Sequence, residues 1–307
     1  MTATVASTSQ RLADVDVVVV AYRSGAAITQ CLAGARAISG VGRVIVVDHG
    51  GDDNWAPAAR AGAIVIGNAA NPGFGAGQNR GFAHGAAPYV LVLNPDAVPR
   101  PDAVAAGIRY LDEHPEVAVV QGVVRDATTG EPDRSQGREL GVLHLFGRAF
   151  GARILLRIAP VRWLATKVAP LRDHVERVPR APVRVDALAA TAWLARRDAL
   201  SRVGGFDEQY FLYGEDLDLC RRLRRAGWEL VALPDEWAIH GQGGSAASSF
   251  ERELTWWAGT LRFTSQWWSA PRRAGALLAA TVRAIGLTAQ RPREARRIWR
   301  ATIGAAP

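Results

Sequence analysis

The amino-acid sequence predicts an α/β fold in which helices cover both faces of a mostly parallel sheet. Short apolar runs rich in β-branched residues alternate with helical stretches along the N-terminal third of the chain. Runs without polar interruption are typical of strands buried on both faces, and their alternation with helices favours parallel pairing. Polar residues follow three of the four runs, which predicts a ligand site at the carboxyl edge of the sheet.

The elements can be placed by residue number. The predicted strands are 16–20, 41–47, 63–66 and 89–93, and the predicted helices are 26–38, 55–61 and 77–87. The polar groups that follow strands are 23–24, 48–53 and 94–96. Because these strand ends should meet at one edge, we expect a single site of nucleotide size there.

A second feature is the crowding of carboxylates in the segment 206–220. Glu215, Asp216 and Asp218 lie among aromatic and aliphatic residues, and arginines follow directly. Such crowding is costly unless a cation, a proton or solvent relieves it, and it is typical of a proton-abstracting site. The alternative is an acidic helix N-terminus stabilised by the helix dipole. This segment alone does not decide between the two.

Five motifs, in order, decide it. They are Val47-Asp-His-Gly-Gly-Asp-Asp53, Asn71-Pro-Gly-Phe-Gly-Ala-Gly-Gln-Asn-Arg-Gly81, Leu93-Asn-Pro-Asp96, Gly204-Gly-Phe-Asp-Glu-Gln-Tyr-Phe-Leu-Tyr-Gly-Glu-Asp-Leu-Asp218 and Trp237-Ala-Ile-His240. Together they resemble the motifs of inverting glycosyltransferases of family 2, which have the GT-A fold, and within that family the rhamnosyltransferase-like branch. The resemblance covers residues 16–245.

The resemblance implies roles for the acids and the histidine. Asp216 would take the proton from the acceptor hydroxyl, and Glu215, the second catalytic candidate, or Asp218 would orient it or the acceptor. Asp96 would bind a divalent cation, Mg²⁺ or Mn²⁺, which neutralises the departing diphosphate, and His240 would be a second metal ligand or a contact of the diphosphate. Asn94 stands where many relatives carry a carboxylate, so metal binding is expected to depend mainly on Asp96.

Further contacts follow from the same resemblance. The residues expected to contact the nucleotide sugar are Tyr22, Asp48, Asp53, Gly73, Asn79, Arg80 and Asn94. Those expected to contact the acceptor are Trp193, Tyr213 and Asp218, although aromatic residues are more often part of a core. His49 and Gly51 depart from the family pattern and leave the base, uracil or thymine, open.

A dinucleotide-binding fingerprint is the rival interpretation of the glycine-rich motif. The motif follows a strand and opens a helix, as that fingerprint requires. The third glycine is absent, however, because Gln78 or Arg80 stands in its place. A nicotinamide-dependent oxidoreductase is therefore disfavoured.

The positive charge is concentrated in two segments. The chain has a net charge of +8; residues 134–184 hold 11 Lys and Arg against 3 Asp and Glu, and residues 255–307 hold 9 Arg against 1 Glu. Arginine together with the tryptophan pairs 256–257 and 267–268 is typical of helices at an anionic membrane surface. Plain packing on the core is the alternative, and nucleic-acid binding is disfavoured. Neither segment has an apolar run long enough to span a bilayer.

These features predict the organisation of the chain. We expect a GT-A domain over 14–250, with a donor half (14–133), a basic helical insertion (134–184) and an acceptor half (185–250), and a basic helical tail (251–307). The loop 241–249 is a candidate lid. Two distant cysteines and the absence of a signal-peptide pattern predict a cytoplasmic protein, associated with the inner face of the membrane.

The sequence thus predicts a metal-dependent inverting glycosyltransferase. The preferred donor is dTDP-rhamnose, and the preferred acceptor is a saccharide of the cell envelope on a polyprenyl diphosphate. One alternative is a transferase that builds polysaccharide from a UDP-hexose. A non-catalytic protein that binds nucleotide sugars or membrane surfaces is the other, and the intact Asp96, Asp216 and His240 argue against it.

Overall fold

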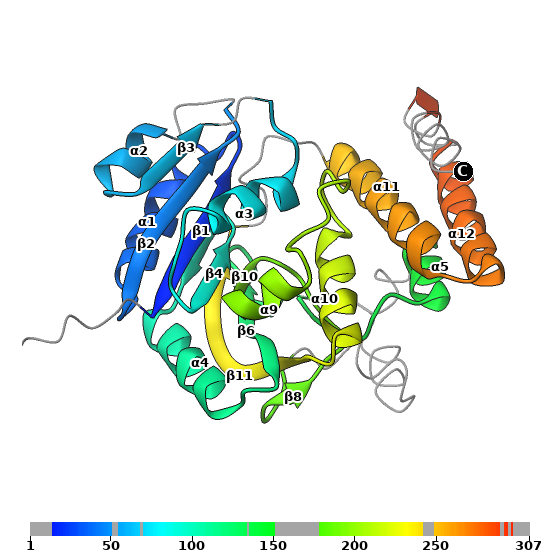
Figure 1. The fold of residues 1–307 in the computed structure, drawn as a ribbon. Helices are drawn as coiled ribbons and strands as arrows, with labels where there is room; N and C mark the ends of the chain where they lie inside the picture. The colour runs from blue at the N-terminus through cyan, green and yellow to red at the C-terminus, as the bar shows by residue number, and fades with distance from the viewer. Residues whose placement is uncertain are drawn as a thin grey trace, which may run out of the picture.

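The computed structural model describes residues 14–50, 55–67, 70–133, 135–150, 178–241 and 249–288, together with 292–293 and 296. One large mixed sheet runs through the centre, with helices on both of its faces (Figure 1). The strand order is β3-β2-β1-β4-β10-β6-β11-β5, and β8 pairs with β11 beside this path. The predicted α/β fold with a mostly parallel sheet is confirmed.

The first half of the sheet agrees closely with the sequence prediction. The strands β1 (Val15–Ala21), β2 (Val41–Asp48), β3 (Ile64–Gly67) and β4 (Tyr89–Leu93) are parallel to one another. The helices between them are α1 (Ala27–Arg36), α2 (Trp55–Arg60) and α3 (Phe74–Phe82). β1 is buried along its whole length, because helices cover both faces.

Helix α3 lies earlier in the chain than predicted. It begins after Gly73, whose φ of 109° only glycine adopts readily. It ends at Phe82, and the turn that follows is held by the buried carboxylate of Asp16, which accepts hydrogen bonds from the N–H groups of Ala86 and Ala87 at 2.6 and 2.8 Å. The residues predicted to continue the helix therefore form a fixed turn.

The second half of the sheet brings the later motifs to the same edge. β10 (Ala192–Arg196) is antiparallel to both β4 and β6 (Val117–Asp126), β11 (Glu229–His240) is parallel to β6, and β5 (Ala97–Pro99) is antiparallel to β11. The helices here are α4 (Pro101–Glu113), α9 (Arg197–Arg202) and α10 (Glu215–Arg225). The short strands are β7 (Gln136–Gly137), β8 (Val183–Arg184) and β9 (Ala187–Leu188).

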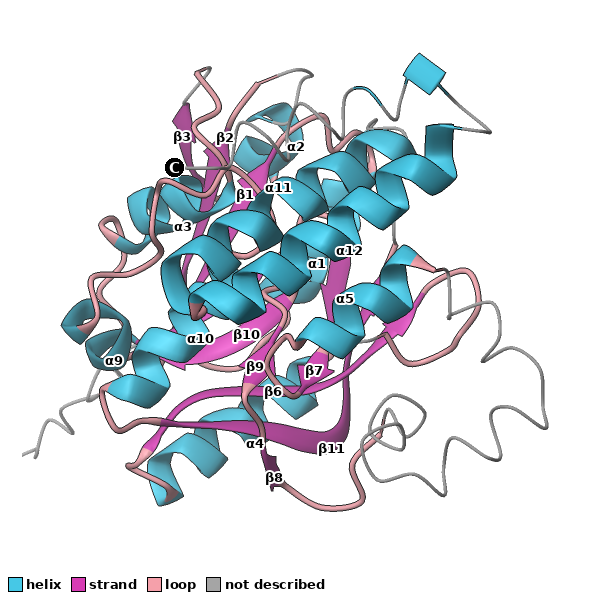
Figure 2. Cartoon of the chain, turned by 90° about the vertical axis from the view of Figure 1, so that its right-hand side faces the viewer, coloured by secondary structure: helices cyan, strands magenta, loops and turns pink. Residues whose placement is uncertain are grey.

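Three helices form a layer beside α10 (Figure 2). They are α5 (Val142–Ala149), α11 (Ser249–Trp267) and α12 (Ala270–Thr288). Trp257 and Trp268 are buried in the apolar cluster that these helices share with Tyr210. The tryptophan pairs thus serve packing rather than an exposed belt, which corrects the reason given for membrane binding from sequence. Most of the basic insertion (151–177) and of the candidate lid (242–248) lies outside the described residues.

Candidate active site

Asp96 and His240 come together at the carboxyl edge of the sheet. Asp96 follows β4, and His240 is the last residue of β11, where it pairs with Ala97 of β5. The N–H of Gly241 donates to the carbonyl of Asp96 at 2.8 Å. This backbone pairing brings His240 Nε2 to 3.2 Å from Asp96 Oδ1.

Asp133 is a third member of this cluster, and no sequence motif pointed to it. Its Oδ2 lies 3.6 Å from His240 Nδ1, the opposite nitrogen of the ring. Burial lowers the pKa of His240, but the two carboxylates outweigh it and raise that pKa to about 9. The imidazole therefore carries a positive charge between two negative groups.

The Asp96–His240 pair fits a divalent cation in the chemistry of its donors. A carboxylate oxygen is the preferred ligand of Mg²⁺ and Mn²⁺, and a neutral imidazole nitrogen adds a borderline donor. Within the described ranges no group of three or more His, Cys, Asp and Glu side chains has the geometry of a complete metal site. Diphosphate oxygens and waters would have to supply the remaining ligands.

Glu215 and Asp216 occupy the first turn of α10. Gly214 precedes them with a φ of 93°, and Asp216 Oδ1 accepts a hydrogen bond from the N–H of Leu217 at 2.8 Å. Glu215 is only 4% exposed, and its Oε2 has no hydrogen-bond partner among the described residues. Burial and the charge of Asp216 raise the pKa of Glu215 well above its ordinary value, and burial also raises the pKa of Asp216.

Backbone contacts connect the acid pair with the strand that leads to Asp96. The N–H of Asn94 donates to the carbonyl of Thr191 at 2.9 Å. The adjacent residue, Ala190, hydrogen-bonds through its backbone to the carboxyl of Asp216. Both ionisable pairs therefore lie at the same edge of the sheet, where a strand-end site is expected.

The glycine-rich motif holds the acid segment in place. A Cβ on Gly73 would overlap the backbone of Phe211, and one on Gly75 would lie 2.9 Å from the Cβ of Phe206. Asn79 accepts from the N–H of Phe206 and donates to its carbonyl, both at 2.8 Å. The side chain of Asn79, predicted to contact the nucleotide sugar, is thus engaged in joining two motifs.

The structure describes most of the other residues predicted to contact the nucleotide sugar. Tyr22 is exposed, and the Arg23 guanidinium lies 5.3 Å from the centre of its ring. Asp48 ends β2 and accepts from the N–H of Gly50 at 2.9 Å, and Arg80 is exposed on α3. Asp53 lies outside the described residues.

Two of the predicted acceptor residues have internal partners. Trp193 is fully buried, with its ring stacked on Phe206 at 5.8 Å. Asp218 is fully buried as well, and accepts from Trp267 Nε1 at 2.8 Å and from Arg222 Nε at 2.7 Å. Tyr213 is part-buried, with a φ of 67°. Neither Trp193 nor Asp218 therefore has free surface for an acceptor.

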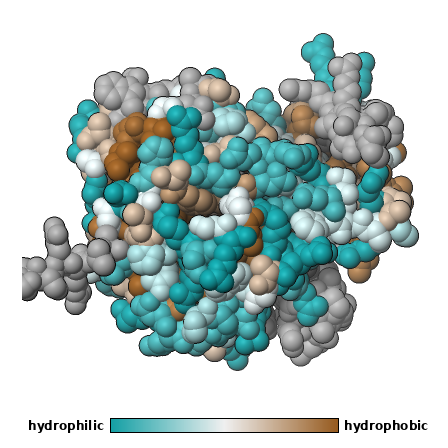
Figure 3. Space-filling view, viewed as in Figure 1, coloured by the Kyte–Doolittle hydropathy of each residue, from teal (hydrophilic) through white to brown (hydrophobic). Residues whose placement is uncertain are grey.

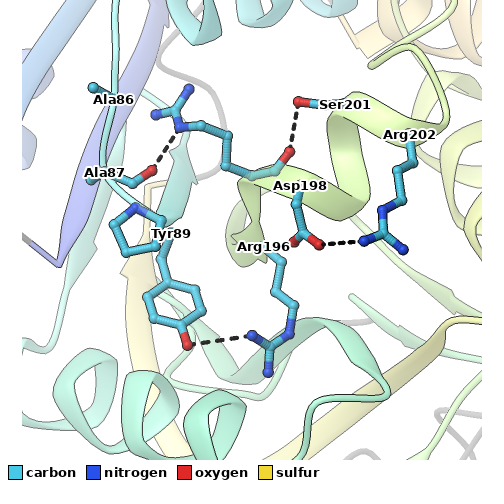
Figure 4. A pocket seen from close by; sticks show the side chains of 9 residues that line it. Ala86, Ala87, Tyr89, Arg196, Asp198, Ser201 and Arg202 are labelled. Carbon is cyan, nitrogen blue, oxygen red and sulfur yellow. Dashed lines mark hydrogen bonds and ion pairs between the residues drawn. The ribbon is translucent and has the colours of Figure 1, made fainter.

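A groove of about 530 Å³ lies at the opposite end of the sheet (Figure 4). It is lined where β4 begins and β10 ends, and it contains three arginines. Arg197 donates to Asp16 and to the carbonyl of Ala87, and Arg196 donates to the carbonyl of Val117. Because these guanidinium groups are engaged in structural hydrogen bonds, the groove is a poor candidate for an anion site.

Comparison with known proteins gives a family and several relatives of similar sequence. Residues 13–260 match the family model described as "Glycosyltransferase like family 2". The chain is 28% identical over 251 residues to N-acetylglucosaminyl-diphospho-decaprenol L-rhamnosyltransferase of Mycobacterium tuberculosis, covering 72% of this chain and 78% of the relative. It is 32% identical over 168 residues to the rhamnosyltransferase WbbL of Escherichia coli K12, covering 55% and 58%.

Solved structures share the fold at low identity. The mannosyltransferase PcManGT of Pyrobaculum calidifontis, in complex with GDP-Man and Mn²⁺, superposes with a TM-score of 0.56 at 16% identity, covering 95% of this chain and 86% of that one. GalNAc-T7 with UDP, GalNAc and Mn²⁺ gives a TM-score of 0.59 at 12% identity, covering 85% and 49%. The fold is that of the GT-A glycosyltransferases.

Proposed function

Since the chain belongs to glycosyltransferase family 2, we propose that it transfers rhamnose from dTDP-rhamnose to a lipid-linked saccharide. The observation that carries the proposal is the presence of two ionisable pairs, Asp96–His240 and Glu215–Asp216, at one edge of the sheet. The rhamnosyl donor and the lipid-linked acceptor are supported by the similarity to the mycobacterial rhamnosyltransferase, whose name gives a decaprenol diphosphate acceptor.

The acid pair provides the proton transfer. Inverting transfer requires a base that removes the proton of the acceptor hydroxyl as that oxygen attacks the anomeric carbon from the face opposite the diphosphate. Asp216 is part-buried at the start of α10 and Glu215 beside it is buried, so Asp216 is the carboxylate that we propose to meet the acceptor. The raised pKa of Asp216 makes its carboxylate a stronger base than an exposed aspartate.

The Asp96–His240 pair is proposed to neutralise the negative charge of the departing diphosphate. Asp96 and His240 would hold a divalent cation, which supplies a Lewis acid for the diphosphate oxygens when bound. His240 must give up its ring proton at Nε2 for that contact, and a proton then stays on Nδ1, 3.6 Å from Oδ2 of Asp133. Tyr22, Asp48, Asp53 and Arg80 are proposed to contact the nucleotide.

The donor is tested by a transfer assay with a synthetic GlcNAc-diphospho-polyprenol acceptor. We expect transfer from dTDP-rhamnose with Mn²⁺ or Mg²⁺, and at least ~100-fold less from UDP-glucose or UDP-galactose. Preferential transfer from a UDP-hexose would replace the rhamnosyl proposal with the polysaccharide alternative. No transfer from any nucleotide sugar would contradict the catalytic assignment.

Association with the inner face of the cell membrane is proposed for the outer faces of α5 and α12. These helices pack side by side, and a Cβ on Gly275 would lie 3.0 Å from Val142 (Figure 2). Apolar side chains on their outer faces are exposed, Leu143 on α5 and Leu278 and Ile285 on α12. Apolar residues also appear at the right-hand edge of Figure 3, where α12 lies.

The charge around this surface complements anionic lipid head groups. Arg272 is exposed at the start of α12, and the segment 255–307 has a strong excess of arginine. An apolar face flanked by arginines binds anionic membranes by shallow insertion and by attraction to head groups. Among the described residues no helix is long and apolar enough to cross a bilayer.

Co-sedimentation with phosphatidylglycerol vesicles tests this surface. The double substitution Leu278→Glu with Ile285→Glu should abolish binding, because it places two carboxylates at the membrane boundary. The matched control is Ile64→Glu on β3, an exposed position on the opposite side of the molecule, which should bind like the wild type (Figure 1). Equal binding of all three proteins would exclude the α5–α12 surface.

A further inference from the structure

We propose that helix α11 is part of the catalytic machinery and that Gly259 is a positioning residue for Asp216. This inference rests on the proposed function. The backbone of Tyr213 and Gly214 approaches α11 directly: a Cβ on Gly214 would lie 2.8 Å from the carbonyl oxygen of Gly259. In turn, a Cβ on Gly259 would overlap the carbonyl oxygen of Tyr213 and come within 2.7 Å of its carbonyl carbon.

The close approach explains an unusual backbone conformation. Tyr213 and Gly214 both have positive φ, 67° and 93°, immediately before the first turn of α10. A positive φ is strained for tyrosine, so the surrounding packing must hold the chain in it. The glycine of α11 leaves the space that this turn occupies, and the turn determines where Glu215 and Asp216 lie.

Side-chain contacts hold the same interface on either side of the turn. Tyr210 donates to Gln266 Oε1 at 2.9 Å, and Trp267 Nε1 donates to the buried Asp218 at 2.8 Å. The guanidinium groups of Arg221 and Arg225 lie 5.1 and 5.3 Å from the centre of the Trp267 ring. Helix α11 therefore contacts the acid segment both before and after Glu215 and Asp216.

None of these α11 residues lies within the motifs that carry the family resemblance, which end before residue 249. They contact none of the residues proposed to bind the nucleotide or the cation in any described interaction. Disturbing α11 should therefore change the chemical step and leave donor binding intact, which separates positioning from general folding.

The test compares Gly259→Ala with Gly286→Ala. Gly286 lies on α12 with no described atom within 4 Å of a Cβ placed on it, so it controls for the glycine-to-alanine change in a helix. Alanine is the better helix former, so neither change weakens its helix intrinsically. We expect Gly259→Ala to lower kcat at least ~10-fold, with the dissociation constant of dTDP-rhamnose in Mn²⁺ within about twofold of wild type. Gly286→Ala should match wild type in both.

A second variant and a second readout cover the case in which Gly259→Ala does not fold. Trp267→Phe keeps an aromatic ring at this position, removes the N–H donated to Asp218 and makes the side chain smaller. Loosening this interface admits water to Glu215, so the pKa of Glu215, followed by NMR of ¹³C-labelled glutamate, should fall toward its ordinary value in either variant.

The outcomes separate the two proposals. If wild type transfers sugar and both α11 variants keep wild-type kcat and Glu215 pKa, the positioning role is wrong and the proposed function stands. If kcat and donor affinity fall together, α11 has only a structural role. If wild type transfers no sugar, the proposed function is wrong. In that case the pKa of Glu215 still tests α11 separately: an unchanged pKa in both variants would contradict the positioning role.

Discussion

The two ionisable pairs at the carboxyl edge of the sheet differ in the sign of their charges. At Asp96–His240 opposite charges meet, and the carboxylates raise the pKa of the imidazole to about 9 despite its burial. At Glu215–Asp216 like charges share a buried helix start, and the pKa values of both carboxyls rise. The first pair suits the binding of a charged ligand, and the second suits the uptake of a proton. A transferase that separates a diphosphate from a sugar needs both.

The largest effect is expected for Asp216→Asn, which removes the base. We expect kcat to fall by roughly 10²–10⁴-fold, the range for loss of a general base, with donor affinity unchanged. The control is Asp198→Asn in the groove at the opposite end of the sheet, which should transfer sugar at the wild-type rate. Equal transfer rates for Asp216→Asn and wild type, measured by mass spectrometry of the product, would refute the assignment of the base.

Asp96→Asn changes the proposed metal site at the Asp96–His240 pair. It removes a carboxylate ligand, so Mn²⁺ binding followed by electron paramagnetic resonance should be lost at concentrations that saturate wild type. Transfer should fall about 100-fold, and EDTA should produce a similar fall in the wild type, because the cation contributes several kcal/mol of charge stabilisation. Full activity of wild type in EDTA would instead show that the pair acts on the diphosphate without a metal.

Asp133→Asn tests whether the third carboxylate orients His240. Loss of such a partner costs about 10–100-fold in metal affinity, and we expect that loss in Mn²⁺ titrations. The substitution should also lower the pKa of His240. Because a raised histidine pKa stabilises the fold fully below about pH 6.5 and no longer above about pH 9, Asp133→Asn should destabilise the protein at pH 6 more than at pH 10. An equal loss of thermal stability at pH 6 and at pH 10 would exclude a stabilising ion pair between Asp133 and His240.

The smallest effect is expected for Glu215→Gln, which removes one of the two like charges at the start of α10 and so changes the stability of the fold. A carboxyl whose folded pKa is raised stabilises the fold at low pH and loses that contribution as pH rises. Glu215→Gln should therefore raise the free energy of unfolding at pH 8 and have little effect at pH 4. Urea unfolding at the two pH values measures this. A variant that is less stable at pH 8 would show that ionised Glu215 makes a favourable contact.

The sequence predicts the strands and the motif residues of the site better than it predicts the residues that support them. The strands of the first half of the sheet follow from local apolar runs, and Asp96, His240 and Asp216 follow from motifs that resemble those of a known family. Asp133 and Gly259 act through contacts with residues distant along the chain, and nothing in the surrounding sequence marks them. The tryptophans of α11 suggested a membrane belt because their pattern is the same whether the partner is a bilayer or helix α10.

The most direct measurement is a crystal structure of the protein soaked with Mn²⁺ and a non-transferable dTDP-rhamnose analogue. An anomalous manganese peak should lie between Asp96 and His240, in contact with the diphosphate, and the anomeric carbon should face the carboxylate of Asp216. A donor bound at this edge with its sugar turned away from Asp216, or manganese bound elsewhere, would contradict the single shared site on which the assignment depends.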